Sequence, residues 1–140
     1  MNFLDHAFLR EHIRSILAFY APGVLDPDGG FFQNFYDDGR VFDPGRRHLV
    51  SSTRMVFNYC KAYELFGQPD DLARARHGLL FVERAHWDGG RGGYHWTLTD
   101  GSVPDDQTNH CYGLAFVVLC YAAAHEAGID GAAHGLRRAV

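Results

Sequence analysis

The chain has 140 residues, of which 46% are hydrophobic and 21% are charged, and this composition indicates one globular domain. Its formal net charge of -4 offers no basic surface for nucleic acid or for an anionic membrane, so neither is an expected partner. The longest apolar run, residues 114–124, is too short to span a bilayer, and the charged N-terminal residues lack the apolar core of a signal peptide, so we expect a cytoplasmic protein.

The first predicted element is an amphipathic helix over residues 3–20, which has an apolar face and a charged face. Pro22 and Gly23 end it. A short aromatic strand at 31–36 follows, and Asp-Asp-Gly at 37–39 is typical of a hairpin turn.

The segment 47–66 is long enough for a helix of about five turns. Apolar side chains spread around most of its circumference, which is typical of a buried helix. Arg54 nevertheless stands near its middle. A guanidinium keeps its charge at any ordinary pH and is costly to bury unpaired, so Arg54 needs either a carboxylate partner or a polar cavity to face. Gly67 closes this helix, and Pro69 lies just beyond it.

The next predicted helix, 71–87, is again amphipathic, and Asp70 can cap it. An aromatic strand that holds Tyr94 and Trp96 follows, and a turn at 100–101 ends the hairpin.

The segment 109–127 predicts a helix that is apolar on every side, and residues 131–140 begin another helix. Three cysteines lie in apolar helical runs without CxxC spacing, so we expect buried reduced thiols. They are Cys60, Cys111 and Cys120. No metal site is expected, because no two histidines stand four residues apart with a supporting carboxylate.

An internal repeat emerges when the chain is compared with itself at a shift of 62 positions. Each unit holds an amphipathic helix, a glycine-bounded hairpin and an apolar helix, and the matches fall in the same order in both. The matching pairs are Gly30 and Gly92, Asp38 and Asp100, Gly39 and Gly101, Val41 and Val103, Asp43 and Asp105, His48 and His110, Val56 and Val118, Tyr59 and Tyr121, Ala62 and Ala124, and Glu64 and Glu126.

The alternation of half-wet and apolar helices predicts an all-α, two-layered ring, the (α/α) toroid, with short β-hairpins between the helices. Helices 3–20 and 71–87 would form the outer layer, and 47–66 and 109–127 the inner layer. Such rings usually have six helix pairs, which at this repeat length needs roughly 350 to 400 residues.

Residues 1–140 hold about two repeats and the start of a third. We therefore expect a single incomplete barrel domain that is the N-terminal fragment of a longer protein. The alternative is a small open helical bundle that closes by dimerising.

Two stretches carry a resemblance to a known family. RHLVSSTRMVFNYCKAYE at 47–64, preceded by GGFFQNFYDDGRVFD, resembles the N-terminal part of the N-acylglucosamine 2-epimerase superfamily. GGYHWTLTDGSVPDDQTNHCYGLAFVVLCYAAA at 92–124 is similar to the next hairpin and inner helix of that family. The most specific pieces are the Ser-Thr-Arg pattern ending at Arg54 and the pair Tyr112 and Phe116.

The resemblance implies an (α/α)6 barrel that interconverts sugars at C1 and C2, as epimerases and mannose, sulfoquinovose and cellobiose enzymes of this superfamily do. The family's acid/base pair is two histidines further along the chain, so no catalytic residue is expected within these residues. The resemblance matches Arg54 with the family's substrate-contacting arginine and Tyr112 with an aromatic residue near the pocket, so both are candidates for substrate binding. No cofactor is needed, because a histidine can remove the C2 proton and a guanidinium can stabilise the resulting negative oxygen.

Two further residues are candidates for substrate binding. His110 lies near the start of an inner helix, where the pocket of a ring would lie, and Trp96 could pack on the apolar face of a sugar. His48 occupies the position equivalent to His110 in the first repeat, and this equivalence also fits a shared structural role. The structural alternative for Arg54 is a buried ion pair.

Three functions remain open at this point. The leading hypothesis is a sugar isomerase or 2-epimerase. A glycoside or unsaturated-uronyl hydrolase would need carboxylates on either side of the glycosidic bond, and no inward carboxylate stands mid-helix. A non-catalytic helical-repeat domain would bind a partner through apolar faces. The exposure of Val117, Val118 and Leu119 would also let the fragment self-associate.

Overall fold

The computed structural model describes residues 4–140, so the start of the first predicted helix, at residue 3, lies outside the described residues. The helices are α1 (His6–Tyr20), α2 (Leu49–Phe66), α3 (Pro69–Phe81), the π-helical turn η1 (Val82–His86), α4 (Cys111–Glu126) and α5 (Ala132–Ala139). The strands are β1 (Asn34–Phe35), β2 (Val41–Asp43), β3 (Arg47–His48), β4 (Trp87–Asp88), β5 (Gly93–Tyr94), β6 (Thr97–Thr99) and β7 (Val103–Pro104). The prediction of a mostly helical fold is confirmed.

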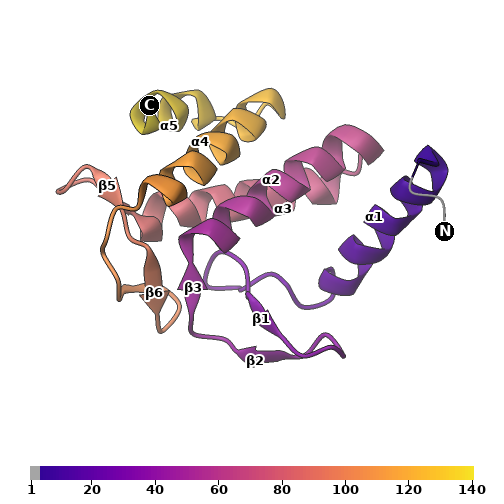
Figure 1. The fold of residues 1–140 in the computed structure, drawn as a ribbon, viewed down its shortest axis with the longest axis horizontal. Helices are drawn as coiled ribbons and strands as arrows, with labels where there is room; N and C mark the ends of the chain where they lie inside the picture. The colour runs from indigo at the N-terminus through magenta and orange to yellow at the C-terminus, as the bar shows by residue number, and fades with distance from the viewer. Residues whose placement is uncertain (1–3) are drawn as a thin grey trace.

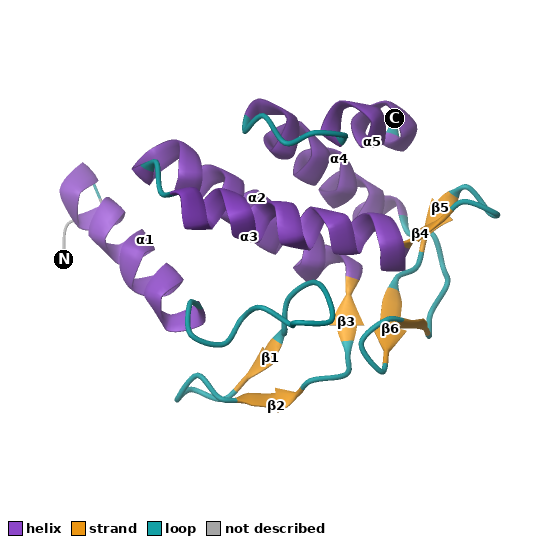
Figure 2. Ribbon diagram, turned by 180° about the vertical axis from the view of Figure 1, so that it is seen from behind, coloured by secondary structure: helices purple, strands orange, loops and turns teal. Residues whose placement is uncertain are grey.

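Helix α2 is the centre of the packing. It contacts α3 on one side and α4 on another, and α4 in turn contacts α5. In Figure 1, α2 and α4 lie in front with α3 behind α2, and the view from behind in Figure 2 brings α3 forward. The short strands gather at the end of the molecule where α2 and α4 begin (Figure 1).

The predicted repeat is visible in the fold. Helices α2 and α4 begin at Leu49 and Cys111, which are 62 positions apart in the sequence. The antiparallel pair β1 and β2 in the first unit corresponds to β6 and β7 in the second. A strand pairing joins the units in addition to the contact between α2 and α4, because β3 pairs antiparallel with β6, with Arg47 opposite Leu98 and His48 opposite Thr97. The two repeats therefore meet where α2 and α4 begin.

Several predicted boundaries differ from the structure. Helix α2 starts two residues later than expected, because Arg47 and His48 are used in the pairing with β6. Helix α3 begins with Pro69 at its first position and not after an Asp70 cap, since the fixed backbone angle of proline suits the start of a helix. The expected helix 71–87 ends as the π-helical turn η1. The expected strand 31–36 is paired with β2 only at β1.

Glycines allow the closest approaches between elements. A Cβ atom at Gly78 in α3 would lie 2.1 Å from the ring of Phe31, and one at Gly135 in α5 would lie 2.2 Å from the ring of Tyr121. Both aromatic rings are fully buried. Each ring therefore packs directly against the helix backbone at its glycine. Any larger residue at either glycine would push the helix and the ring apart.

The two helices predicted to be apolar on every side each bury one face and expose the other. In α4, Val117 is fully buried, which contradicts the expectation that it is exposed, whereas Leu119 is 40% exposed. Cys111 is exposed, so the prediction of a buried thiol is wrong at that position and holds for Cys60 and Cys120. Position along the helix explains the difference, because Cys111 is its first residue and precedes the packed turns.

The buried guanidinium of this chain belongs to Arg47 and not to Arg54. Arg47 is fully buried at the start of α2, and its Nη2 atom donates to Oδ2 of Asp26 at 2.5 Å. Its Nη1 atom donates to the carbonyl oxygen of Pro44 at 2.6 Å, and the guanidinium lies 5.0 Å from the ring centre of Phe32. The buried guanidinium thus has the carboxylate partner that burial requires, but it belongs to Arg47, seven positions before Arg54.

We predict that Asp26→Asn lowers the free energy of unfolding by about 3 kcal/mol, because it leaves the buried Arg47 charge without its carboxylate. The measurement is urea denaturation followed by circular dichroism. Asp38→Asn is the matched control, since Asp38 pairs with Arg40 at the surface, and little change is expected there. Equal effects of the two substitutions would contradict this interpretation of the buried pair.

Candidate functional site

Arg54 lies on the exposed face of α2, and no carboxylate among the described residues bonds to it. Its guanidinium stands over the ring of Phe116 in α4, 5.5 Å from the ring centre. Phe116 in turn contacts Tyr112 edge to face, with ring centres 5.1 Å apart. Arg54 therefore approaches Tyr112 through Phe116, and among the described residues it lacks the carboxylate partner that was one of its two expected environments.

Trp96 forms the second part of the site, between β5 and β6. Its ring centre lies 4.3 Å from that of His48 and 4.3 Å from that of His110. The Trp96 ring also covers Gly113 in α4, where a Cβ atom would lie 2.9 Å from it. Gly113 follows Tyr112 in the sequence, so the tryptophan packs against the first turn of α4, which also carries Tyr112.

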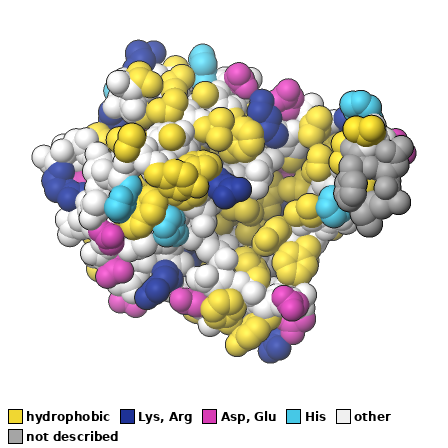
Figure 3. Space-filling model, in the orientation of Figure 1, with side chains coloured by type: hydrophobic (Ala, Val, Ile, Leu, Met, Phe, Trp, Pro, Cys, Tyr) yellow, Lys and Arg dark blue, Asp and Glu magenta, His cyan; other side chains and the backbone are white. Residues whose placement is uncertain are grey.

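The four residues predicted to bind substrate form one group made of two sets of contacts. Arg54 reaches Tyr112 through Phe116, and Trp96 contacts His110 and the Gly113 position of α4. We call this group, together with His48 and Phe116, the aromatic site. Figure 3 views the molecule in the orientation of Figure 1, where apolar, arginine and histidine side chains lie side by side on the face over α2 and α4. Tyr112 is 62% exposed, so its ring is free to contact a ligand.

A buried polar network lies on the other side of α2, beneath the aromatic site. His86 in η1 donates its Nδ1 proton to the carbonyl oxygen of His95 at 3.0 Å, so its Nε2 atom accepts from the Ser52 hydroxyl at 3.0 Å. Gln33 donates to the same hydroxyl at 2.9 Å and accepts from the backbone N–H of His48 at 2.7 Å. These bonds fix how α2 is turned about its axis, and thus where Arg54 points.

His86 is neutral in this network. It is fully buried, and burial lowers its pKa to about 4 from an ordinary value of 6.5. The π-helical turn brings it inward to Ser52 while Glu83 of the same turn bonds outward to Arg138 in α5. Such turns often occur at functional sites. The sequence pattern gave no signal for this turn, and Ser52, His86 and Gln33 were not recognised as a group.

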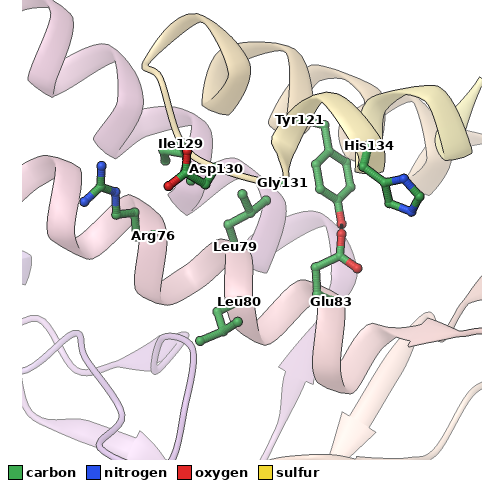
Figure 4. A pocket seen from close by; sticks show the side chains of 9 residues that line it. All are labelled: Arg76, Leu79, Leu80, Glu83, Tyr121, Ile129, Asp130, Gly131 and His134. Carbon is green, nitrogen blue, oxygen red and sulfur yellow. Dashed lines mark hydrogen bonds between the residues drawn. The ribbon is translucent and has the colours of Figure 1, made fainter.

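A separate pocket of 580 Å³ lies between α3, α4 and α5, and Figure 4 shows its lining. The residues around it are Arg76, Leu79, Leu80, Glu83, Tyr121, Ile129, Asp130, Gly131 and His134. Its central polar groups are already satisfied, because Tyr121 donates to Glu83, and both Glu83 oxygens accept from Arg138 at 2.8 and 2.9 Å. The pocket holds no residue of the aromatic site.

The described residues, 4–140, hold neither a cluster of metal ligands nor a membrane-spanning helix. None of their His, Cys, Asp and Glu side chains form a group of three that could hold a metal ion. None of the helices is long and apolar enough to cross a bilayer.

Comparison with known proteins places this geometry in context. Residues 30–140 match the model of the family described as N-acylglucosamine 2-epimerase. The chain is 48% identical to a D-mannose isomerase of Marinomonas mediterranea over 130 residues, which are 93% of this chain and 32% of that protein. It is 28% identical to a cellobiose 2-epimerase of Eubacterium cellulosolvens over 84% of this chain and 29% of that protein.

The fold agrees with the sequence comparison. A crystal structure of a D-mannose isomerase superimposes with a TM-score of 0.93 at 44% identity, over 99% of this chain and 35% of that one. The chain thus spans about a third of the length of the relatives that it matches.

We predict that acidification removes the contribution of His86 to stability. Its folded-state pKa lies below the unfolded value, so only the unfolded chain binds a proton between pH 6.5 and about 4. The free energy of unfolding should therefore decrease as the pH is lowered from 6.5 to about 4. His86→Asn should flatten the dependence, whereas His134→Asn, at an exposed histidine, should leave it unchanged. Denaturation at a series of pH values checks this, and parallel curves for parent and His86→Asn would contradict it.

Proposed function

The chain belongs to the N-acylglucosamine 2-epimerase family, and we propose that it forms the N-terminal part of an aldose–ketose isomerase or 2-epimerase acting on a sugar such as D-mannose. The observation that carries the proposal is the 48% identity to a D-mannose isomerase along 93% of the chain. The proposed domain is an (α/α)6 barrel, of which residues 1–140 supply two repeats and the start of a third.

In this proposal the chemistry passes through an enediol formed by removal of the C2 proton. The proton is moved by histidines that the family resemblance assigns to a later part of the barrel, outside this chain. The role of Arg54 is electrostatic. It is charged at any ordinary pH, and it is held over Phe116 instead of being neutralised by a carboxylate, so its field remains available to oxygen that becomes negative in the reaction.

The remaining residues of the aromatic site would bind and orient the sugar. The exposed ring of Tyr112 and the ring of Trp96 offer flat apolar surfaces for the C–H face of a pyranose. His110 lies against Trp96 at the start of α4 and can exchange hydrogen bonds with hydroxyl groups. No cofactor takes part in the proposed reaction.

The distribution of carboxylates favours isomerisation over hydrolysis. The acidic residues of α2 and α4 are Glu64 and Glu126, near the far ends of the helices. Lys61 bonds both, at 2.7 and 3.1 Å. The face that carries Arg54 and Tyr112 therefore has no pair of acids for cleaving a glycosidic bond within these two helices.

The first test of the proposed function is a chimera in which this chain replaces the matching third of the Marinomonas mediterranea D-mannose isomerase. We expect the chimera to interconvert D-mannose and the corresponding ketose, because the 48% identity should preserve the contacts across the junction. The 140-residue chain alone should not turn over D-mannose or cellobiose and should self-associate through its exposed apolar face. A folded but inactive chimera would count against the proposal.

The second test is Arg54→Lys in the same chimera. We expect kcat/KM for D-mannose to fall on the order of 10- to 100-fold, because an ammonium cannot reproduce the planar guanidinium on Phe116 or its fork of donors. The melting temperature should stay close to that of the parent, since Arg54 is exposed. Arg46→Lys, at another exposed arginine, is the control and should keep full activity. Unchanged kinetics in Arg54→Lys would mean that Arg54 does not contact substrate.

A further inference from the structure

His48 has an arrangement of contacts that its place in the repeat does not explain. It precedes α2 with extended backbone angles, and its Nδ1 atom accepts a hydrogen bond from the backbone N–H of Val50 at 3.2 Å. This bond caps the helix that carries Arg54. His110 precedes α4 at the equivalent position, yet it makes no such side-chain bond. The two histidines therefore differ in structural role, because only the side chain of His48 caps its helix.

The helix cap determines which nitrogen of His48 carries the proton. A ring nitrogen that accepts a hydrogen bond has no proton, so the proton of neutral His48 is on Nε2. Burial lowers the pKa of His48, and the nearby His110 ring lowers it further, so the neutral form is favoured. Residues 4–140 provide no hydrogen-bond partner for this Nε2–H group.

The surroundings of His48 hold the ring in place. Its backbone N–H donates to Gln33 at 2.7 Å, and β3 pairs it with Thr97 of β6. Its ring meets Trp96 at a steep angle of 68°, so one of its edges lies against the tryptophan instead of stacking on it. The side chain is only partly buried. A fixed N–H donor beside an aromatic ring is an arrangement that suits a hydroxyl group of a sugar lying on that ring.

We propose that His48, as the neutral Nε2–H tautomer, is a substrate-contacting residue that donates a hydrogen bond to one hydroxyl of the sugar bound over Trp96. The inference rests on the proposed function and adds a specificity determinant to it. Arg54 supplies charge, whereas His48 supplies a directional neutral donor. A site built to bond one hydroxyl discriminates strongly against a sugar that lacks it.

The experiment uses the chimera and separates the two roles of the ring. His48→Asn keeps a side-chain oxygen that can cap α2, because asparagine is a good capping residue, but it removes the Nε2–H donor. His48→Ala removes both. His125→Asn, at an exposed histidine near the end of α4, is the control. For each protein, melting temperature, KM and kcat are measured with D-mannose and with its monodeoxy analogues.

We expect His48→Asn to melt close to the parent and to raise KM for D-mannose on the order of tenfold, as the loss of one good hydrogen bond to a ligand requires. His48→Ala should have the same raised KM as His48→Asn, and its melting temperature should be lower than that of His48→Asn. One monodeoxy sugar should give equal kcat/KM with parent and His48→Asn, because it lacks the hydroxyl that His48 bonds.

Two results would overturn the inference while leaving the proposed function intact. One is an unchanged KM in His48→Asn. The other is a loss that is the same for every deoxy sugar and follows the melting temperature, which would mark His48 as a helix cap only. An inactive parent chimera would instead overturn the proposed function, and this inference with it.

Discussion

The hydrogen bond between Ser52 and His86 is the constraint on which the arrangement of the site depends. It lies on the buried face of α2, and it is possible only because the chain leaves α3 through the π-helical turn that brings His86 inward. Because His86 is tied on its other side to the backbone of His95, the helix cannot rotate without leaving a buried polar group unsatisfied. Arg54, two residues after Ser52, is consequently held on the opposite, exposed face.

The junction of the two repeats gives the site its second support. Strand β3 pairs with β6, and the buried Arg47 at this junction is neutralised by Asp26 from the first loop. Trp96 follows β5 at the same junction. It therefore lies at the N-terminal ends of both α2 and α4, where it contacts His48 and His110. Residues from the two repeats therefore meet on one surface, and each is held by a helix or by the paired strands at the junction.

The aromatic site is organised before any ligand binds. Arg54 lies over Phe116, Phe116 contacts Tyr112, and Trp96 contacts both His48 and His110, so each of these side chains has a neighbour that restricts its rotation. Such restriction lowers the entropy that binding would otherwise cost. The pocket between α3 and α5 lacks this character, because its central acid and tyrosine already bond to each other and to Arg138.

The sequence by itself determined the elements of the chain, the 62-residue repeat and the family, because these depend on local hydrophobic periodicity, on glycine-bounded turns and on a motif such as that at Arg54. It also predicted four substrate-binding residues, and their role stays a prediction: Arg54 reaches Tyr112 through Phe116, and Trp96 contacts His110. It could not decide which arginine is buried, since Arg47 and Arg54 both begin or interrupt an apolar run. Only the tertiary structure made that choice, along with the π-helical turn and the His48 cap, because each depends on partners that lie far away in the sequence and are brought close by packing.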